Sequence, residues 1–317
     1  MLALLAILAV DLTSIGAYAP HPVDVVLAEP AKSLFEVVDP SDVAAPIGEW
    51  RHFVEFNGAN YRVVDLKGRP GTLGLDRYGV TWDLERHRSN GDILAFGLNY
   101  QRLSYSDNYT LAGVKAPVES ADHWSLDASY HDRSRSGWSW RLGGRAESGV
   151  TNDVMPWEEL ALGGTMGLTL HASDSVDFEL SLDAFDRPES DLRIVPLALV
   201  NWQLNDSLRL GRVAGGYGFD YSFDPRTNYF VSVDYEERSY RMASDALPAD
   251  GLLRDQERSV RAGMVWHPKQ AIQLELFAGA ADRHMVLFDD GEGLDSFDVE
   301  AAPFVGFRLL FGKGSIF

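Results

Sequence analysis

The sequence predicts an all-β chain made of long antiparallel strands, and three observations support this fold class. Apolar and polar residues alternate in many runs, the runs are long, and short and long connections between them also alternate. The clearest run is 160–170, where the even positions other than Gly164 are leucine or methionine and the odd positions are small or polar. Because side chains along a strand point to opposite faces in turn, this pattern indicates a strand with one apolar and one polar face.

The alternation begins near Trp50 and continues almost to the end of the chain. Large apolar residues, many of them aromatic or β-branched, occupy every second position between groups of turn residues, which is typical of strands. Many runs extend over about 10 to 14 residues, whereas ordinary strands average about five or six and a tilted strand of ~10 residues crosses a bilayer. The strands expected in order are 52–64, 73–86, 94–100, 124–130, 138–142, 160–171, 176–185, 200–204, two within 207–223, 229–235, 260–266, 272–278 and 305–311.

The connections between the runs predict a membrane topology. Transmembrane barrels have short periplasmic turns and long outer loops, so both ends of this barrel are expected in the periplasm. Short turns are expected at 89–91, 133–137, 172–175, 205–206, 224–227 and 268–270. Long connections are expected at 107–119, 149–157, 186–193, 242–253 and 284–298.

The expected fold is a single antiparallel up-and-down transmembrane β-barrel of about fourteen strands, an even number as the class requires. The count depends on residues 207–223, which are divided at Gly215-Gly216 into two strands that are short for a bilayer. Merging these two strands and omitting 52–64 gives about twelve, which is also even. The alternative of twelve places several early short turns outside the cell, so fourteen is preferred.

The polar faces of the expected strands carry many charges, which the core of a soluble β-sandwich does not. In a barrel these faces line the lumen, where charges of both signs either border a hydrated pore or pair into a network that fills the interior. Lumen-facing glycines such as Gly163, Gly263 and Gly279 are expected to leave additional room. The charged residues expected to line the lumen are Asp127, Arg141, Arg145, Glu147, Asp177, Glu179, Asp183, Asp234, Glu236, Arg238, Arg261 and Glu275.

Aromatic residues near the short turns predict one membrane interface, because such residues gather where a bilayer meets water. The opposite, apolar faces are expected to contact outer-membrane lipid and lipopolysaccharide. The residues expected to form this girdle, on the periplasmic side, are Trp82, Tyr130, Trp138, Trp202, Phe223, Tyr229 and Trp266.

The N-terminal residues predict export. Residues 1–19 contain an apolar run and end in an A-x-A box, as signal peptides do. Residues 20–49 contain five prolines and are expected to form a periplasmic leader or a plug, and residues 50–317 are expected to form the barrel. The 317-residue chain has no cysteine and a formal net charge of -19. Disulfides are therefore excluded, and nucleic-acid binding, which needs clustered lysine and arginine, is not expected.

The sequence contains no catalytic motif. Hydrolysis by serine and histidine needs a nucleophile, a base and an orienting group that converge, and no G-x-S-x-G element is present. His131 and His171 end lumen-facing runs near short turns and are interpreted as interfacial polar residues. No histidine pair or acidic loop has the spacing of a metal site. We therefore expect no catalytic residues, no metal and no cofactor.

The end of the chain resembles the assembly signal of a known class. Phe307, Leu309 and Phe311 alternate and Phe317 is terminal, although residues 312–315 interrupt the alternation. Together with the strand pattern over 50–317, these residues make the chain similar to Gram-negative outer-membrane β-barrel proteins. The resemblance implies an outer-membrane location and recognition by the barrel-assembly machinery.

Three functions remain open at this point. The first is a passive channel for small hydrophilic solutes, suggested by the charged lumen face, in which the excess of carboxylates predicts a mild cation preference. The first alternative is a non-conducting barrel with a structural or adhesive role, in which the charges pair across the lumen. The second alternative is a membrane-embedded hydrolase, although we expect that the protein is not an enzyme.

Overall fold

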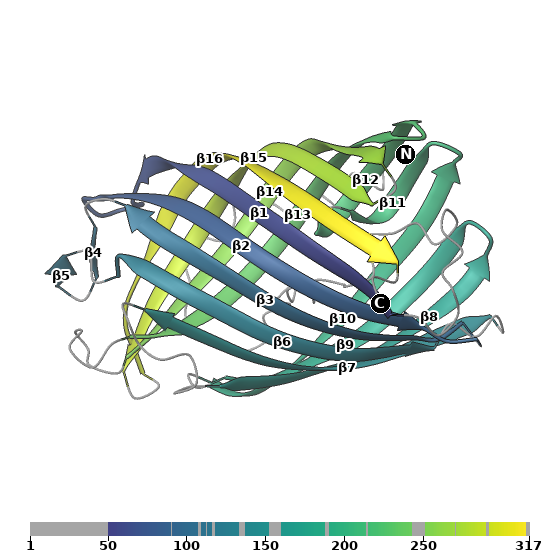
Figure 1. Ribbon diagram of the computed structural model, residues 1–317. Helices are drawn as coiled ribbons and strands as arrows, with labels where there is room; N and C mark the ends of the chain where they lie inside the picture. Colours follow the sequence, from purple (N-terminus) through teal and green to yellow (C-terminus); the bar gives the residue numbers. More distant parts are fainter. Residues whose placement is uncertain are drawn as a thin grey trace.

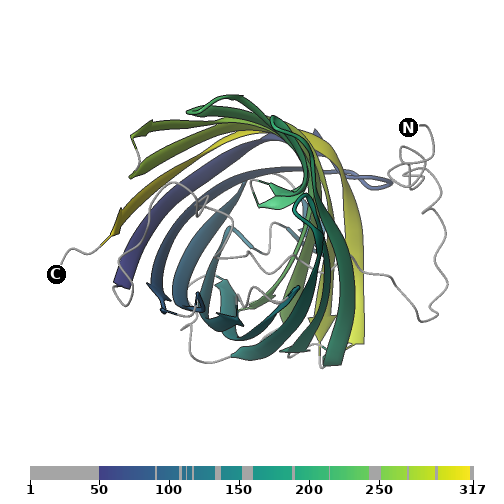
Figure 2. The same ribbon diagram turned by 90° about the vertical axis from the view of Figure 1, so that its right-hand side faces the viewer.

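The computed structural model describes residues 50–314 except 90, 107–108, 112, 116–117, 133–136, 152–159, 188–189, 214, 243–250, 270 and 290–291. Over the described residues the chain forms a closed antiparallel barrel of fourteen strands, seen from the side in Figure 1 and along the barrel in Figure 2. No described residue belongs to a helix that is long and apolar enough to cross a membrane. The predicted fold class and the preferred count of fourteen strands are confirmed.

Neighbouring barrel strands are consecutive in the sequence, and the last strand pairs with the first to close the ring. The separate strands β4 (Thr110–Leu111) and β5 (Val114–Lys115) form a small sheet in the connection after β3. The barrel strands are β1 (Trp50–Asp65), β2 (Thr72–His87), β3 (Ile93–Ser106), β6 (Ser120–Asp132), β7 (Trp138–Thr151), β8 (Ala161–Ser173), β9 (Val176–Arg187), β10 (Ser190–Asn205), β11 (Leu208–Val213), β12 (Gly216–Asp224), β13 (Thr227–Arg241), β14 (Leu252–Lys269), β15 (Ile272–Asp289) and β16 (Glu292–Gly314).

The apolar residues of the alternating pattern lie on the outside of the barrel. Leu162, Met166, Leu180 and Val231 are each more than half exposed, and similar residues occur around the whole ring. A soluble protein does not expose an apolar belt of this extent, whereas lipid is a favourable environment for it. A closed barrel also pairs the backbone groups of its strands, which the bilayer requires. The architecture is therefore that of outer-membrane-type β-barrels.

Two connections that the sequence predicts to be long loops are mostly strand, so these two expectations were wrong. β9 and β10 together occupy most of 186–193, and β15 and β16 occupy most of 284–298. In the second hairpin His284 pairs with Asp298 across the strands, with 2.9 Å between Nδ1 and Oδ1. Polar residues on the outer face mark where these strands leave the apolar belt, whereas the strands themselves continue beyond it.

The two ends of the barrel differ in their connections, and we name the two halves accordingly. The terminal half contains the described chain ends, Trp50 and Gly314, and short turns such as 206–207 between β10 and β11. The loop half contains the longer β3–β6 connection with β4 and β5. In Figure 1 the arrowhead of β16 points toward the terminal half, and the labels β4 and β5 lie at the loop half.

The two halves also differ in the number of strands that enclose the interior. β11 ends at Val213 and β12 begins at Gly216, so this hairpin does not extend through the loop half. There β13 meets β7 directly, through a parallel bridge between Arg241 and Val150. Among the described residues, the loop half is therefore enclosed by nine strands, which are β13, β14, β15, β16, β1, β2, β3, β6 and β7.

Candidate functional site in the barrel lumen

The described part of the lumen contains a cavity of about 70 Å³, formed by side chains of β2, β3, β6, β7 and β13 and by the β11–β12 turn. Five carboxylates and two guanidinium groups border it. The residues that line this lumen cavity are Thr81, Asp83, Gly97, Leu98, Asn99, Gln101, His123, Ser125, Asp127, Arg145, Glu147, Gly215, Asp234, Tyr235, Glu236 and Arg238. The excess of carboxylates makes the cavity electronegative, which favours cations.

Arg145 on β7 organises one wall of the lumen cavity. Its Nε donates to Asp127 Oδ1 on the neighbouring β6 at 2.6 Å, and its Nη1 lies 3.9 Å from Glu147 Oε2. Glu147 Oε2 also lies 3.8 Å from Nε2 of His123. His123 Nδ1 and the Gln101 amide oxygen are buried and have no hydrogen-bond partner in the described protein. These two atoms remain as acceptors, or as a donor for one histidine tautomer, toward water or a solute.

A second group of charges also faces the lumen, on the part of the wall formed by β7, β8, β9 and β11. Glu179 on β9 is between two arginines, with Arg141 Nη2 at 3.2 Å and Arg212 Nη2 at 3.1 Å from Oε1. Asp183 on the same strand accepts a hydrogen bond from Thr165 at 2.6 Å. Carboxylates of β9 are thus paired in the plane of the wall, by residues of β7, β8 and β11.

Asp177 and Glu275 complete the set of lumen carboxylates that the sequence singles out. Asp177 lies beside a short turn and its Oδ1 is 2.8 Å from Nδ1 of His171, both side chains being partly exposed. Glu275 is fully buried on β15 and lies 3.4 Å from Nη1 of Arg308. Arg261 donates to the Ser232 hydroxyl at 3.2 Å. Six of the twelve predicted lumen residues border the lumen cavity, namely Asp127, Arg145, Glu147, Asp234, Glu236 and Arg238. The other six line the interior at other heights.

A layer of buried charges separates the lumen cavity from the loop half. Arg77 Nη1 lies 2.6 Å from Glu236 Oε2, and Glu236 also pairs with Arg238. Arg283 lies between two further buried carboxylates, 2.6 Å from Asp255 Oδ2 and in contact with Glu257. With side-chain exposures of 0 to 4%, Arg283 and both carboxylates are removed from water. We call Arg77, Glu236, Arg238, Asp255, Glu257 and Arg283 the charged layer.

Apolar side chains fill the interior of the loop half beyond the charged layer. The hydrophobic cluster there joins residues from β1, β2, β3, β13, β14, β15 and β16. Its members include Tyr61, Leu75, Leu103, Tyr105, Tyr240, Leu253, Met285 and Phe304. An interior enclosed by about eight strands is just wide enough for side chains to fill, so the nine-stranded ring explains this packed core. We call this cluster the apolar core.

Three of the lumen-facing glycines do not leave the extra room that the sequence suggests, whereas Gly97 does line the lumen cavity. Phe185 lies over Gly163, Phe230 over Gly263 and Phe304 over Gly279, each from the directly opposed position on the next strand. A methyl group on any of these glycines would lie 2.7 to 2.9 Å from the ring. The glycines make space for aromatic rings, a packing arrangement that also fixes the strand register.

Several charged residues of the lumen are absent from the set that the sequence singles out, namely Arg77, Arg212, Asp255, Glu257, Arg283 and Arg308. Most of these residues could have been identified from the sequence, because they occupy polar positions in the alternating pattern. Asp255, Glu257 and Arg261 share one face of β14, and Arg308 lies between the apolar residues of the last strand. Arg212 could not be found in this way, because it reaches Glu179 from a strand that is too short to show its own pattern.

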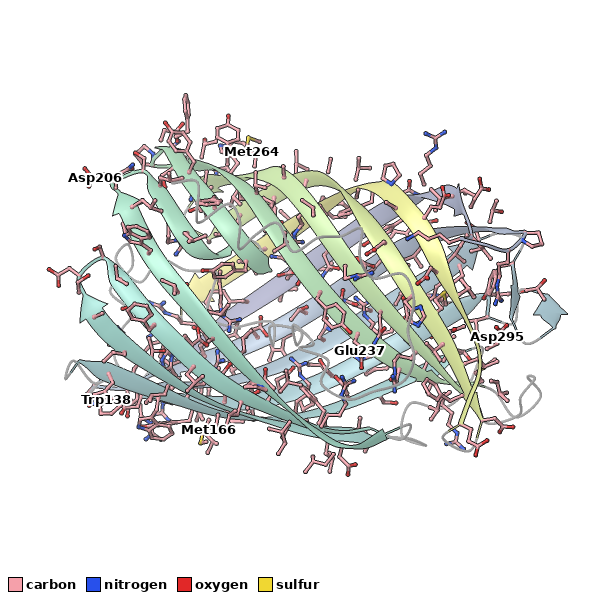
Figure 3. All side chains as sticks on the ribbon, turned by 180° about the vertical axis from the view of Figure 1, so that it is seen from behind. Trp138, Met166, Asp206, Glu237, Met264 and Asp295 are labelled. Atoms are coloured by element: carbon pink, nitrogen blue, oxygen red, sulfur yellow. The ribbon has the colours of Figure 1, made fainter. Side chains whose placement is uncertain are left out.

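The aromatic residues of the predicted girdle belong to the terminal half. Trp82, Trp138, Trp202, Phe223 and Trp266 are all more than a third exposed on the outer face. Tyr229 is exposed too, whereas Tyr130 is partly buried and donates a hydrogen bond to Asp92. Figure 3 shows Trp138 on the outside of the barrel at the same end as the turn residue Asp206.

The predicted assembly signal lies partly outside the described residues. Phe307 and Phe311 are exposed on the outer face of β16, with Leu309 between them in the same alternation. Phe317 lies outside the described residues, as do the signal peptide and the leader or plug over 1–49.

In the described part of the chain, no group of three histidine, aspartate or glutamate side chains is arranged to hold a metal ion.

Comparisons with known proteins found similar solved structures, all of low sequence identity. No protein-family model matches the chain, and no curated protein matches it. An outer membrane channel from Pseudomonas putida F1 has a TM-score of 0.47 and 13% identity, covering 87% of this chain and 100% of that one. A FadL homologue from Pseudomonas aeruginosa has a TM-score of 0.43 and 12% identity, covering 84% of this chain and 90% of that one. The KdgM porin in complex with oligogalacturonate has a TM-score of 0.35 and 11% identity, covering 81% of this chain and 98% of that one.

Proposed function

We propose that the protein is a passive outer-membrane channel for small hydrophilic solutes, with a preference for cations. The observation that carries the proposal is the lumen cavity, where five carboxylates and two guanidinium groups face a shared space. Charged side chains on the inside and apolar ones on the outside are the arrangement of water-filled barrels. Because the apolar core fills the axis of the loop half, we expect a small unitary conductance.

The proposal includes an orientation and partners. Both chain ends would lie in the periplasm, because short turns gather in the terminal half and barrels of this class keep short turns on the periplasmic side. The outer belt would contact outer-membrane lipid and lipopolysaccharide. The barrel-assembly machinery would recognise the last strand through Phe307, Leu309, Phe311 and Phe317.

Conductance in a planar bilayer tests the function. In a salt gradient, the reversal potential of the wild-type channel should indicate a preference for cations. Glu147→Gln, which removes one carboxylate from the lumen cavity, should reduce this preference. Asp282→Asn is the matched control, because Asp282 pairs with Arg258 on the outer face and should leave the reversal potential unchanged. Folded protein that never conducts, or that prefers anions, would contradict the proposal.

A second candidate is favoured by a different observation, namely the packed interior of the loop half. In this candidate the barrel conducts nothing and has a structural or adhesive role. Removing residues 20–49 distinguishes two versions of it. If that segment forms a plug, conductance should begin when it is removed. If the apolar core closes the barrel, the truncated barrel should still conduct no ions.

A further inference from the structure

The barrel wall contains a seam between β10 and β13. β10 pairs with β9 along its length, from Ser190 to Trp202, but its pairing with β11 includes only 202–205. On the other side, the pairing of β12 with β13 ends at Val233. Among the described residues, 190–201 of β10 and 234–240 of β13 therefore have no strand paired along the edges that face each other. Figure 3 shows this side of the barrel, with Glu237 of β13 labelled.

The seam begins within the apolar belt. Val233, where the pairing of β12 with β13 ends, is exposed on the outer face, as is Val231 before it. On the β10 side, Ile194 is 62% exposed and Leu192 is similarly exposed. Unpaired backbone groups are costly in lipid, so an edge at this level must be covered or supplied with other partners. The seam thus lies where molecules dissolved in the membrane reach the wall.

The sequence of β10 is adapted to an unpaired edge. Pro196 lies in the middle of the unpaired segment, and proline is confined to edge positions in sheets because it has no N–H to donate. The carbonyl oxygen of Val200 accepts a hydrogen bond from the Tyr217 hydroxyl at 2.6 Å. The Asn201 side chain accepts from the backbone N–H of Arg212 at 3.3 Å. Side chains replace strand pairing at the point where the seam begins.

The lumen face of β10 is apolar, unlike that of the strand beside it. Val195, Leu197 and Leu199 are directly opposed to Asp183, Ser181 and Glu179 of β9, and the pairs share the lumen face. The outer face of the same segment is apolar too, so residues 194–200 present apolar side chains to both sides of the wall. Leu197 is only 9% exposed, and Val195 and Leu199 on either side of it are half-buried.

An ion pair crosses the seam. Arg193 extends from the lumen face of β10, and its Nη1 lies 3.2 Å from Oε1 of Glu237 on β13. Glu237 is buried, and it accepts further hydrogen bonds from Tyr235 and Gln256 at 2.7 and 2.6 Å. Near this level, the β11–β12 turn lies against the lumen side chains, because a methyl group on Gly215 would be 2.8 Å from Arg261 and 3.0 Å from Arg308.

We propose that the seam is a lateral passage by which small uncharged apolar molecules move from the membrane into the lumen. Its apolar inner stripe, made of Val195, Leu197 and Leu199, offers such molecules apolar contacts that ions would avoid, because charged groups pay a desolvation cost there. The Arg193–Glu237 pair is the contact that must separate for passage. This function goes beyond the ion-conducting channel, because the two kinds of solute would use different routes.

A reversible cross-link across the seam tests the proposal. The chain has no cysteine, so Arg193→Cys/Glu237→Cys can be joined specifically by a short bis-maleimide that contains a cleavable disulfide. The assay uses vesicles with a lipopolysaccharide outer leaflet and internal cyclodextrin, and it follows naphthalene influx by fluorescence. We expect the cross-link to reduce influx to the rate of protein-free vesicles, and reduction of the linker to restore it. Ion conductance should not change.

Two controls keep the test specific. Arg258→Cys/Asp282→Cys, joined by the same reagent, links the paired strands β14 and β15 on the outer face and should not affect influx. Without any cross-linker, Leu197→Asp places a charge in the inner stripe and should slow influx. Thr169→Asp adds the same charge to the lumen face of the paired strand β8 and should not.

Three results would overturn the lateral passage. One is naphthalene influx that the cross-link leaves unchanged. Another is influx no faster than in protein-free vesicles although the unmodified protein keeps its folded, heat-sensitive gel mobility. The third is joint loss of conductance and influx on cross-linking, which would mean one shared path. A protein that conducts no ions but still admits naphthalene at the expected rate would instead contradict only the proposed ion conductance.

Discussion

The two halves of the barrel share nine strands but have opposite interiors. The terminal half has fourteen strands and a charged interior, whereas in the loop half nine strands enclose an apolar core. The lumen cavity lies where the two halves meet and is lined by β2, β3, β6, β7, β13 and the β11–β12 turn. The change occurs where the β11–β12 hairpin ends and β13 meets β7. Because the number of strands sets the width of a barrel, the short hairpin decides which part of the interior is hollow and which is filled.

The comparison also explains why similar charges behave differently along one lumen. Arg145 and Asp127 keep side-chain exposures of 16% and 20%, so we expect water in the lumen cavity to stabilise each of them without its partner. Arg283 and Asp255 have exposures of 4% and 0% and depend on each other. A buried charge that loses its partner is costly, whereas a hydrated one is not.

The largest effect is expected from breaking the contact that closes the nine-stranded ring. At Gly149 on β7, any side chain would overlap the carbonyl oxygen of Ser239 on β13. Because backbone cannot move aside as a side chain can, Gly149→Val should cost more than the about 1–3 kcal/mol of ordinary overpacking and should prevent closure of the ring. The measurement is gel mobility with and without heating, in which the variant should lose the folded band.

Gly144→Val is the matched control for this change. Gly144 lies on the same strand, is exposed to the outside, and has its nearest neighbour 3.9 Å from the position of an added methyl group. A valine there contacts lipid, so the folded band should persist. If Gly149→Val and Gly144→Val fold equally well, the β7–β13 contact does not close the loop half.

The next largest effect concerns the charged layer. Arg283→Met leaves Asp255 and Glu257 buried without their shared arginine, so the free energy of unfolding should fall by about 3–5 kcal/mol. Arg258→Met removes the exposed partner of Asp282 and should cost less than about 1 kcal/mol. Denaturant unfolding from lipid vesicles, followed by tryptophan fluorescence, measures both. Equal losses in the two variants would show that the charged layer is hydrated.

The third effect concerns the apolar core. Leu103 is fully buried in it, so Leu103→Ala should lower the free energy of unfolding by about 2–5 kcal/mol. If the core is what narrows the axial route, the unitary conductance should also rise. Val231→Ala, on the exposed outer face, should change neither quantity much. A stable Leu103→Ala variant with unchanged conductance would indicate that ions do not pass through this part of the interior.

Much of this structure could be predicted from the sequence, because alternation with a period of two is a local signal. The alternation predicted the outer faces, the strand count and the division of 207–223 at Gly215-Gly216. The bounds of β11 and β12 confirm this division. The hollow and filled halves could not be predicted, since they depend on the contact between β7 and β13, far apart in the chain. The role of Arg193 was hidden for the same reason, because its partner Glu237 lies on a strand that is not its neighbour in the sheet.

The smallest change in stability, and the sharpest contrast, should come from repeating the arginine substitution in the terminal half. Arg145→Met removes the partner of Asp127 at 2.6 Å, just as Arg283→Met removes that of Asp255. Because both partners border the lumen cavity, water replaces the lost contact, and the cost should stay below about 1 kcal/mol. The lumen becomes more negative, so the reversal potential should shift toward stronger cation preference. A stability loss as large as that of Arg283→Met would mean that the terminal half is as dry as the loop half, and the cavity could not then conduct ions.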